Sequence, residues 1–183
     1  MEVILPRQVF LTRGQGRHRE KLVSFELALR AAGISPFNLV RVSSIFPPHC
    51  QVISRASGLK KLQAGQIVFL VMSENSTDEA HREISSAIGL AIPQDPDQYG
   101  YLAEHEGFGE TEKEASLRAE ELAAEMLATK LGQNYSPQNF TRGKNNYYSL
   151  NDRLTVQTRS LSQIATGSKG LWTTTVAAAV LVT

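Results

Sequence analysis

Residues 38–48 read Asn-Leu-Val-Arg-Val-Ser-Ser-Ile-Phe-Pro-Pro, an apolar and β-branched run that meets two serines and then two prolines. The run predicts a strand over Phe37–Phe46. Pro47 and Pro48 predict a rigid, extended exit from it, because proline fixes its own φ and restricts the residue before it. We therefore expect the Ser43–Ser44 peptide bond to be fixed in one conformation and able to hold strain.

The Ser43–Ser44 bond is a candidate for self-cleavage. A serine hydroxyl can attack the preceding carbonyl carbon and move the acyl group from nitrogen to oxygen, provided that the geometry is fixed and an oxyanion donor lies nearby. β-Elimination of the ester would leave a dehydroalanine that hydrolyses to a pyruvoyl group. The pair alone does not establish this, since most such segments are turns. A second pair, Ser85-Ser86, lies inside a predicted helix where this chemistry is implausible.

Length and composition indicate one globular domain over residues 1–183, with 42% hydrophobic and 20% charged residues. The net charge is +1 and basic residues are scattered, which argues against a nucleic-acid partner. Cys50 is the only cysteine, so no internal disulfide can form, and a cytoplasmic location is expected. The first eight residues do not resemble a signal peptide, and Val176–Val182 is far shorter than the roughly 20 residues of a membrane helix.

The spacing of apolar residues predicts the remaining elements. A strand is expected over Val3–Thr12, followed by a flexible polar loop over Arg13–Arg17. A helix is expected over Glu20–Ala32, with Gly33 as its stop. Further strands are predicted at Gln66–Met72, Tyr99–Glu106, Leu150–Ser160 and Trp172–Thr183.

Two more helices and one insertion complete the prediction. The helices cover Glu79–Ala91 and Thr111–Leu131, and the second begins with a capping box of Thr111 and Glu114. Gln133–Ser149 is rich in polar residues and is expected to be a loop or insertion. Together these elements predict a layered mixed fold in which helices cover sheet faces.

Three motifs resemble a known family, the pyruvoyl-dependent arginine decarboxylases of archaea and bacteria. They are residues 38–48, then Ser86–Pro93, then Glu104-His105-Glu106-Gly107, in the family's order and approximate spacing. A weaker similarity at Phe25–Gly33 extends the match toward the N-terminus. The resemblance covers roughly two thirds of the chain, and agreement of three separated motifs by chance is very rare.

The resemblance implies an α+β fold, a four-layer αββα sandwich. It also implies a homo-oligomer, a trimer or a dimer of trimers, with active sites between neighbouring subunits. Self-cleavage would give a β chain of residues 1–43 and an α chain of residues 44–183 that begins with the pyruvoyl group made from Ser44. By the same resemblance, Asn38 aligns or stabilises the cleavage site and Glu104 is the proton donor.

The implied reaction is the decarboxylation of L-arginine to agmatine and carbon dioxide. A pyruvoyl group supplies the electron sink that pyridoxal phosphate (PLP) supplies elsewhere, so neither PLP nor a metal is expected. Glu104 would return a proton to the substrate. Glu106 is the alternative acid, and a regular strand is expected to let only one of the two glutamates face the pocket.

Arginine specificity calls for a carboxylate that meets the planar guanidinium with two hydrogen bonds. Glu26, on the helix before the cleavage strand, is the candidate. The resembling proteins carry aspartate at this position, so Glu26 keeps the charge and reaches one methylene further. The alternative is that Glu26 is only a solvated helix residue.

Other readings stay open or are set aside on physical grounds. Gly14-Gln15-Gly16 lacks the residues that follow a phosphate cradle, and a loop is expected instead. His105 alternates with two glutamates and so faces away from them, which disfavours a metal site. Cys50 is expected to be packed, not nucleophilic.

The rival functions are the same chemistry on another amino acid, such as ornithine or aspartate, and a non-catalytic trimeric scaffold.

Overall fold

The computed structural model describes residues 4–132, 140–142, 147–150 and 154–183, and in this part the chain forms two β-sheets and three helices. The mixed α/β composition expected from the sequence is confirmed. In chain order the elements are β1 (Gln8–His18), α1 (Lys21–Ala32), β2 (Asn38–Arg41), β3 (Ile45–Phe46), β4 (Gln51–Val52), α2 (Arg55–Leu59), β5 (Ile67–Thr77), β6 (Glu83–Pro93), β7 (Gly100–Phe108), α3 (Glu112–Lys130), β8 (Phe140–Arg142), β9 (Tyr147–Leu150), β10 (Leu154–Thr166) and β11 (Trp172–Val182).

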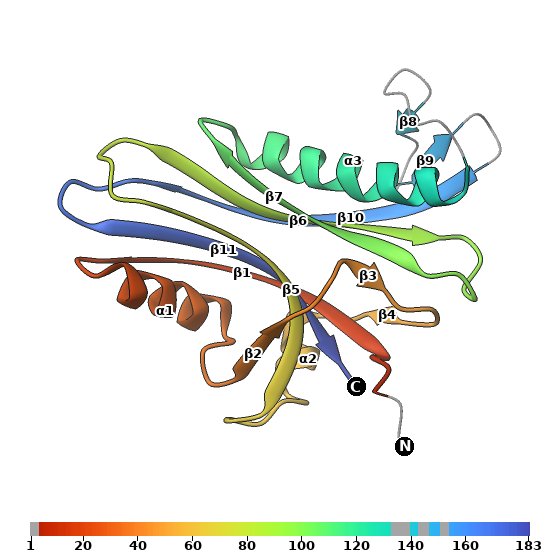
Figure 1. Cartoon of the computed structure of the whole chain (residues 1–183), viewed down its shortest axis with the longest axis horizontal. Helices are drawn as coiled ribbons and strands as arrows, with labels where there is room; N and C mark the ends of the chain where they lie inside the picture. Colours follow the sequence, from red (N-terminus) through yellow and green to blue (C-terminus); the bar gives the residue numbers. More distant parts are fainter. Residues whose placement is uncertain (1–3, 133–139, 143–146, 151–153) are drawn as a thin grey trace.

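The first sheet has the strand order β2-β5-β11-β1-β4. Its centre is β11, which pairs antiparallel with both β1 and β5, while the edge strands β2 and β4 run parallel to their neighbours. Helix α1 packs on β1 and β11, and α2 contacts β1 (Figure 1). The first sheet is thus assembled from both ends of the chain.

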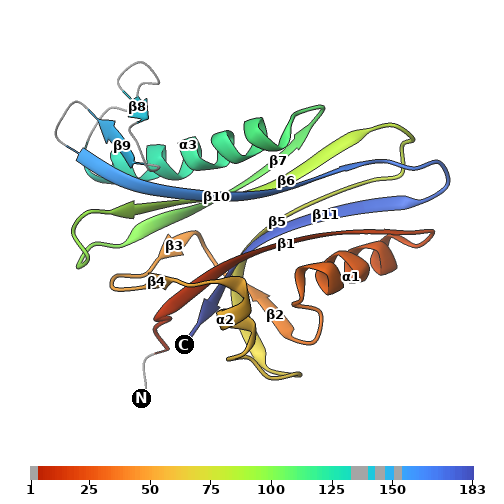
Figure 2. The same cartoon turned by 180° about the vertical axis from the view of Figure 1, so that it is seen from behind.

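The second sheet has the strand order β3-β7-β6-β10-β9-β8 and is antiparallel throughout. Helix α3 packs across β6, β7 and β10. Seen from opposite sides in Figures 1 and 2, the two sheets lie against each other, with α1 beside the first and α3 beside the second. Between the sheets, buried side chains from both meet in one apolar cluster that includes Val9, Val71, Ala177, Ile88, Leu90 and Leu102.

The predicted loop at Arg13–Arg17 is wrong, because β1 continues without a break to His18. The two glycines have another purpose there. A Cβ built on Gly16 would overlap the Ser24 carbonyl oxygen of α1, and one built on Gly14 would overlap the Ala28 carbonyl oxygen. Glycine at these positions lets the helix backbone lie directly on the strand.

The predicted helix at Glu79–Ala91 is also wrong, since residues 83–93 form strand β6. Every residue from Ile84 to Ala91 is buried, because α3 covers one face of β6 and the first sheet covers the other. A strand covered on both faces shows no alternation of polar and apolar residues, and the spacing imitated a helix. Gly89 confirms the close cover, because a Cβ there would overlap the Ala119 backbone.

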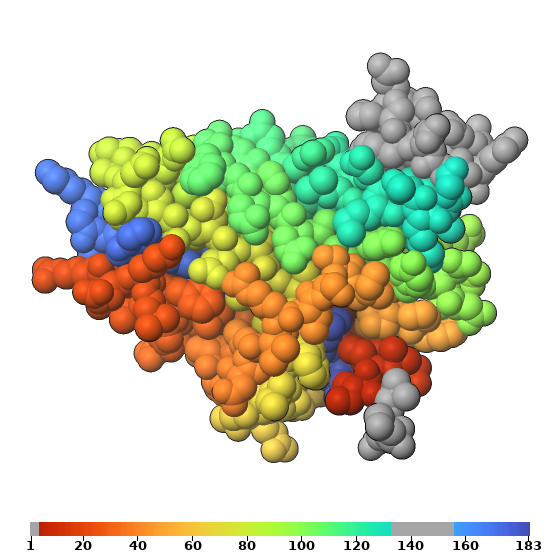
Figure 3. Space-filling view, in the orientation of Figure 1, coloured from red at the N-terminus to blue at the C-terminus, as the bar shows by residue number. Residues whose placement is uncertain are grey.

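The predicted strand at Phe37–Phe46 is two short strands in different sheets. The chain leaves the first sheet after Arg41 and joins the second at Ile45. The crossover Val42–Ser44 connects the edges of the two sheets, and Figure 3 shows this segment, in orange, at the surface of the molecule.

Both other helix predictions are confirmed. Gly33, with φ of 78°, ends α1 in the left-handed conformation. Helix α3 begins with the expected capping box, in which the Thr111 amide donates to the Glu114 carboxylate at 2.8 Å and the Glu114 amide donates to the Thr111 hydroxyl at 3.3 Å. These hydrogen bonds lower the pKa of Glu114 from its usual value.

The strands predicted at Gln66–Met72, Tyr99–Glu106 and Trp172–Thr183 are confirmed with shifted ends as β5, β7 and β11, and the strand predicted from Val3 begins only at Gln8. The strand predicted at Leu150–Ser160 is confirmed as β10 from Leu154 onward, whereas Leu150 ends β9 and residues 151–153 lie outside the described residues. The expected insertion at Gln133–Ser149 falls partly outside the described residues. Within it, residues 140–142 and 147–149 belong to β8 and β9, so the expectation of a loop is wrong for these residues. No helix in the described part of the chain is long and apolar enough to cross a membrane.

Candidate active site

Ser44 and Glu104 meet at the edge where the chain changes sheets. The Ser44 hydroxyl donates a hydrogen bond to Glu104 Oε2 at 3.1 Å. Ser44 precedes β3, which pairs with β7, and the Leu102 amide donates to the Ser44 carbonyl oxygen at 2.8 Å. Glu104 lies two residues after Leu102 and so projects from the same face of β7. Strand pairing therefore brings the predicted proton donor to the predicted cleavage residue.

Backbone hydrogen bonds hold the crossover on both sides of the Ser43–Ser44 bond. Before it, the Val42 amide donates to the Leu70 carbonyl oxygen at 3.0 Å, which ties the crossover to β5. Across it, the Ile45 amide donates to the Ser43 carbonyl oxygen at 2.9 Å. Ser43 is exposed and Ser44 is half-buried. Neither residue has a positive φ, so the expected strain does not take the form of a left-handed backbone.

Asn38, at the start of β2, does not hydrogen-bond to either serine within the described residues. Its side-chain amide donates to the Gly65 carbonyl oxygen at 2.7 Å, and its backbone amide donates to the Gln66 carbonyl oxygen at 2.8 Å. The side chain is exposed at the edge of the first sheet. Within one chain, Asn38 thus anchors the start of the strand that leads to the serines.

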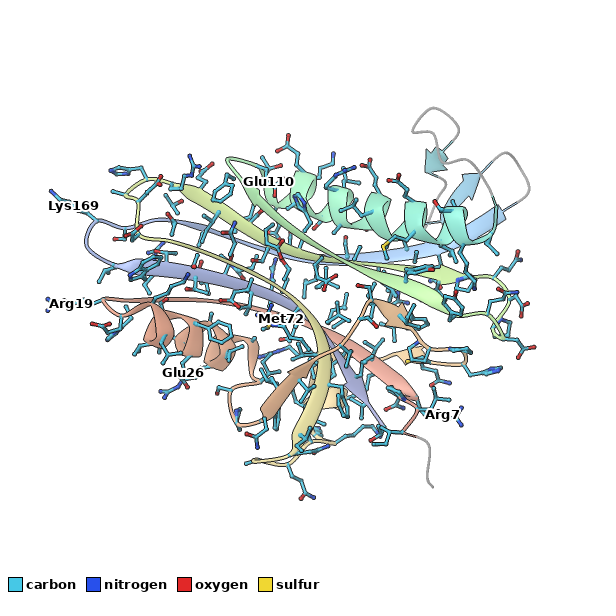
Figure 4. All side chains as sticks on the ribbon, in the orientation of Figure 1. Arg7, Arg19, Glu26, Met72, Glu110 and Lys169 are labelled. Atoms are coloured by element: carbon cyan, nitrogen blue, oxygen red, sulfur yellow. The ribbon has the colours of Figure 1, made fainter. Side chains whose placement is uncertain are left out.

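Glu26 lies on α1 and pairs with Arg30 one turn later, at 2.6 Å. Figure 4 shows Glu26 and Glu110 on opposite sides of the two sheets. The hydrogen bonds and ion pairs of the described residues do not connect Glu26 to Ser44 or Glu104. One chain therefore brings together Ser43, Ser44 and Glu104, and leaves Glu26 apart from them.

The expectation that only one of Glu104 and Glu106 can face the pocket is wrong. Strand β7 is regular, and residues two apart lie on the same face of a strand. The two glutamates differ instead in contact, since Glu104 accepts the Ser44 hydrogen bond and Glu106 is exposed. His105 lies on the opposite face, where its Nε2 is 2.9 Å from a Glu110 oxygen. No cluster of three or more potential metal ligands occurs in the described residues.

The sequence did not indicate two polar contacts near this edge. Glu110 accepts from the Ser85 hydroxyl as well as contacting His105. Arg41 forms an ion pair with Glu74 at the rim of a cavity of about 400 Å³. This cavity lies between α1 and the first sheet and is lined by Phe25, Leu29, Phe37, Asn38, Leu39, Arg41, Met72 and Glu74. Ser85 and Glu110 lie 25 positions apart in the chain and Arg41 and Glu74 lie 33 apart, so the fold brings these partners together. His105 is only five positions from Glu110.

Cys50, Ser85 and Ser86, which were not expected to react, are packed or hydrogen-bonded in the structure. Cys50 packs against the cluster between the sheets, and burial raises the pKa of its thiol to about 11. Such a thiol is a weak nucleophile at neutral pH. Ser85 and Ser86 lie on β6, not on a helix, and each hydroxyl is hydrogen-bonded, to Glu110 and Thr175 respectively.

A model of the family described as pyruvoyl-dependent arginine decarboxylase matches residues 8–183. A probable pyruvoyl-dependent arginine decarboxylase of Chlorobium phaeovibrioides is 49% identical over 97% of both chains. The pyruvoyl-dependent arginine decarboxylase of Thermoplasma volcanium is 48% identical over 100% of this chain and 99% of its own. That of Methanococcoides burtonii is 45% identical over 98% of this chain and 99% of its own. With matches of this length and identity, the chain belongs to the pyruvoyl-dependent arginine decarboxylase family.

Proposed function

We propose that the chain decarboxylates L-arginine to agmatine and carbon dioxide with a pyruvoyl group made from its own Ser44. The observation that carries this proposal is the 3.1 Å hydrogen bond from the Ser44 hydroxyl to Glu104 at the junction of the two sheets. The family's name specifies the group and the substrate, and the residues present fit the group. A serine that can become the carbonyl lies next to a carboxyl that can handle a proton.

The pyruvoyl group arises when the chain cuts itself between Ser43 and Ser44. Residues 1–43 become the β chain and residues 44–183 the α chain. The two stay together, because β1 of the smaller chain pairs with β11 of the larger along eleven residues, from Gln8 to His18. On the smaller chain, β2 likewise keeps its hydrogen bonds to β5.

In the decarboxylation, the pyruvoyl group supplies an electron-withdrawing carbonyl that stabilises the charge left when carbon dioxide departs. Glu104 supplies the proton that replaces the lost carboxylate. In the uncut chain its Oε2 lies 3.1 Å from the Ser44 Oγ, so the carboxyl stands beside the residue that would carry the pyruvoyl carbonyl. Leu102 holds the Ser44 carbonyl oxygen through its amide, so residue 44 keeps its place against β7.

Asn38 and Glu26 complete the site across subunits, with Asn38 aligning the cleavage site and Glu26 binding the guanidinium, in a trimer or a dimer of trimers. In their own chain both side chains contact other residues, Asn38 the Gly65 carbonyl oxygen and Glu26 the Arg30 guanidinium. The edge of the molecule at β2 and β3 supports such an arrangement, because it exposes the apolar side chains of Val40 and Ile45, each 40% accessible. Exposed apolar side chains beside a polar site are typical of a surface that meets another subunit.

The four-layer αββα sandwich also belongs to this proposal, as does a single domain over residues 1–183. The contacts of α1 with β1 and β11, and those of α3 with β6, β7 and β10, support the layer order. The apolar cluster shared by both sheets supports one domain. The single cysteine, held half-buried as a thiol, supports a cytoplasmic location.

A substrate panel tests the proposed activity. Purified protein is incubated with arginine, ornithine and aspartate, while released carbon dioxide and the amine product are measured. Agmatine from arginine alone is expected, and Ser44→Ala is the inactive control. Faster turnover of ornithine or aspartate would contradict the substrate. A correctly cut chain that releases no carbon dioxide from any of the three amino acids would instead support the function of a non-catalytic scaffold.

A further inference from the structure

The self-cleavage begins at one carbonyl group, that of Ser43. When the Ser44 hydroxyl attacks the carbonyl carbon, the carbonyl oxygen takes up negative charge. A donor that lies ready at this oxygen lowers the barrier, and hydrogen bonds to a developing oxyanion are usually the largest single contribution of an active site. The crossover can therefore promote this step only if a hydrogen-bond donor lies next to the Ser43 carbonyl oxygen.

The donor that the structure provides is the backbone amide of Ile45. It lies 2.9 Å from the Ser43 carbonyl oxygen, in a tight turn centred on Ser44. Strand β3 is the edge of its sheet, with β7 as its one neighbour strand. The Ile45 amide goes back to Ser43, whereas the carbonyl of Ser44 takes the ladder hydrogen bond from Leu102.

We infer that the Ile45 amide is the oxyanion donor of the self-cleavage, an inference that rests on the proposed function. In this step the Ser44 Oγ bonds to the Ser43 carbonyl carbon, the bond from that carbon to the Ser44 nitrogen breaks, and the hydroxyl proton ends on the nitrogen. The Ser43 oxygen is negative only in between. The Ile45 hydrogen bond strengthens as that charge grows, since charge-assisted hydrogen bonds are about twice as strong as neutral ones.

The surrounding contacts keep this donor aligned. The hydrogen bond from the Leu102 amide of β7 fixes the chain directly after the scissile bond, at the Ser44 carbonyl oxygen. The Ser44 side chain is directed to Glu104 on the same strand as Leu102. Because these two contacts hold residue 44 to β7, the turn keeps the Ile45 amide at the Ser43 oxygen, and the donor needs no rearrangement when the charge develops.

The test replaces the Ser44–Ile45 peptide bond by an ester, through incorporation of the α-hydroxy analogue of isoleucine at position 45. This removes the amide proton and keeps the side chain. The matched control is the same exchange at Val42, whose amide makes a hydrogen bond of 3.0 Å to Leu70, outside the scissile carbonyl. Folding is checked by near-ultraviolet circular dichroism, and the uncut fraction is followed over time by denaturing mass spectrometry.

The Ile45 ester should be cut about 100-fold more slowly than the wild type, the loss typical of one oxyanion donor, and the Val42 ester within about threefold of it. An ester also acidifies the Ser44 Cα–H more than an amide does, so it would hasten the later elimination. Slower cleavage therefore reports on the acyl shift. A folded Ile45 ester that is cut as fast as wild type, or a Val42 ester that is slowed equally, would overturn the inference. A wild-type chain that is never cut would instead overturn the proposed function.

Discussion

The Ser44 hydroxyl and the Glu104 carboxylate share a hydrogen bond of 3.1 Å although they lie 60 positions apart in the chain. The contact exists because a two-residue strand, β3, pairs with β7 immediately after the serines. One short strand pairing thus joins the proposed cleavage residue to the proposed proton donor, at the edge where the chain passes from the first sheet to the second.

Glu104→Gln should be cut normally and lose decarboxylase activity by about 100-fold or more, the contribution typical of a positioned general acid. The amide oxygen of glutamine still accepts a hydrogen bond from Ser44, but its NH₂ group is too weak an acid to return a proton. Denaturing mass spectrometry and carbon dioxide release measure the two effects separately. Glu106→Gln is the control on the same face of β7, and an equal loss in that variant would contradict the assignment.

Glu26→Gln should raise the KM for arginine by about tenfold, because a charge-assisted hydrogen bond to the guanidinium is worth roughly 1.5–3 kcal/mol. The cleavage should proceed unchanged. Arg30→Gln breaks the same ion pair but leaves the Glu26 carboxylate in place. It therefore separates the effect of Glu26 on arginine binding from the effect of the ion pair on the stability of α1. If both variants change KM alike, or neither does, Glu26 is only a solvated helix residue.

Gly16→Ala should lower the free energy of unfolding by about 1–3 kcal/mol, as expected when a methyl group is forced into a filled space. The added Cβ would overlap the Ser24 carbonyl oxygen and push α1 away from β1. Gln15→Ala, at an exposed position of the same strand, should change stability little. Urea unfolding of both variants measures this, and equal midpoints would show that the helix does not rest on the glycine.

Cys50 should react with iodoacetamide at pH 8 about 100-fold more slowly in the folded chain than in the denatured chain. Burial raises the pKa of its thiol from 9.0 to about 11, and only the thiolate reacts. The rate in the folded chain should keep rising as the pH approaches 11. Equal rates in folded and denatured protein at pH 8 would contradict the buried position.

Local sequence signals predicted the elements whose determinants are local. Thr111 and Glu114 stand at the start of α3 and Gly33 directly follows the end of α1, and both helices form as expected. The errors occurred where tertiary packing decides. Strand β6 is covered on both faces, so its sequence does not alternate between polar and apolar residues. Gly14 and Gly16 leave room for the backbone of α1, and no local sequence pattern distinguishes such glycines from those of a loop.

The residues of the candidate site were predictable from the sequence, but several of their contacts were not. The serines and Glu104 stand in the motifs that resemble the family, and the strand pairing brings them together. Contacts that depend on distant pairing, such as Arg41 with Glu74, carry no signal in the sequence. The division of residues 37–46 between two sheets was missed because a single apolar run does not show where a chain changes its neighbours.

Self-cleavage is the central claim, and the mass of the purified protein under denaturing conditions tests it most directly. We predict two chains, residues 1–43 and residues 44–183, with the larger lacking a free terminal amine, while Ser44→Ala stays whole. A wild-type chain that keeps the single mass of 20.1 kDa after prolonged incubation would contradict it.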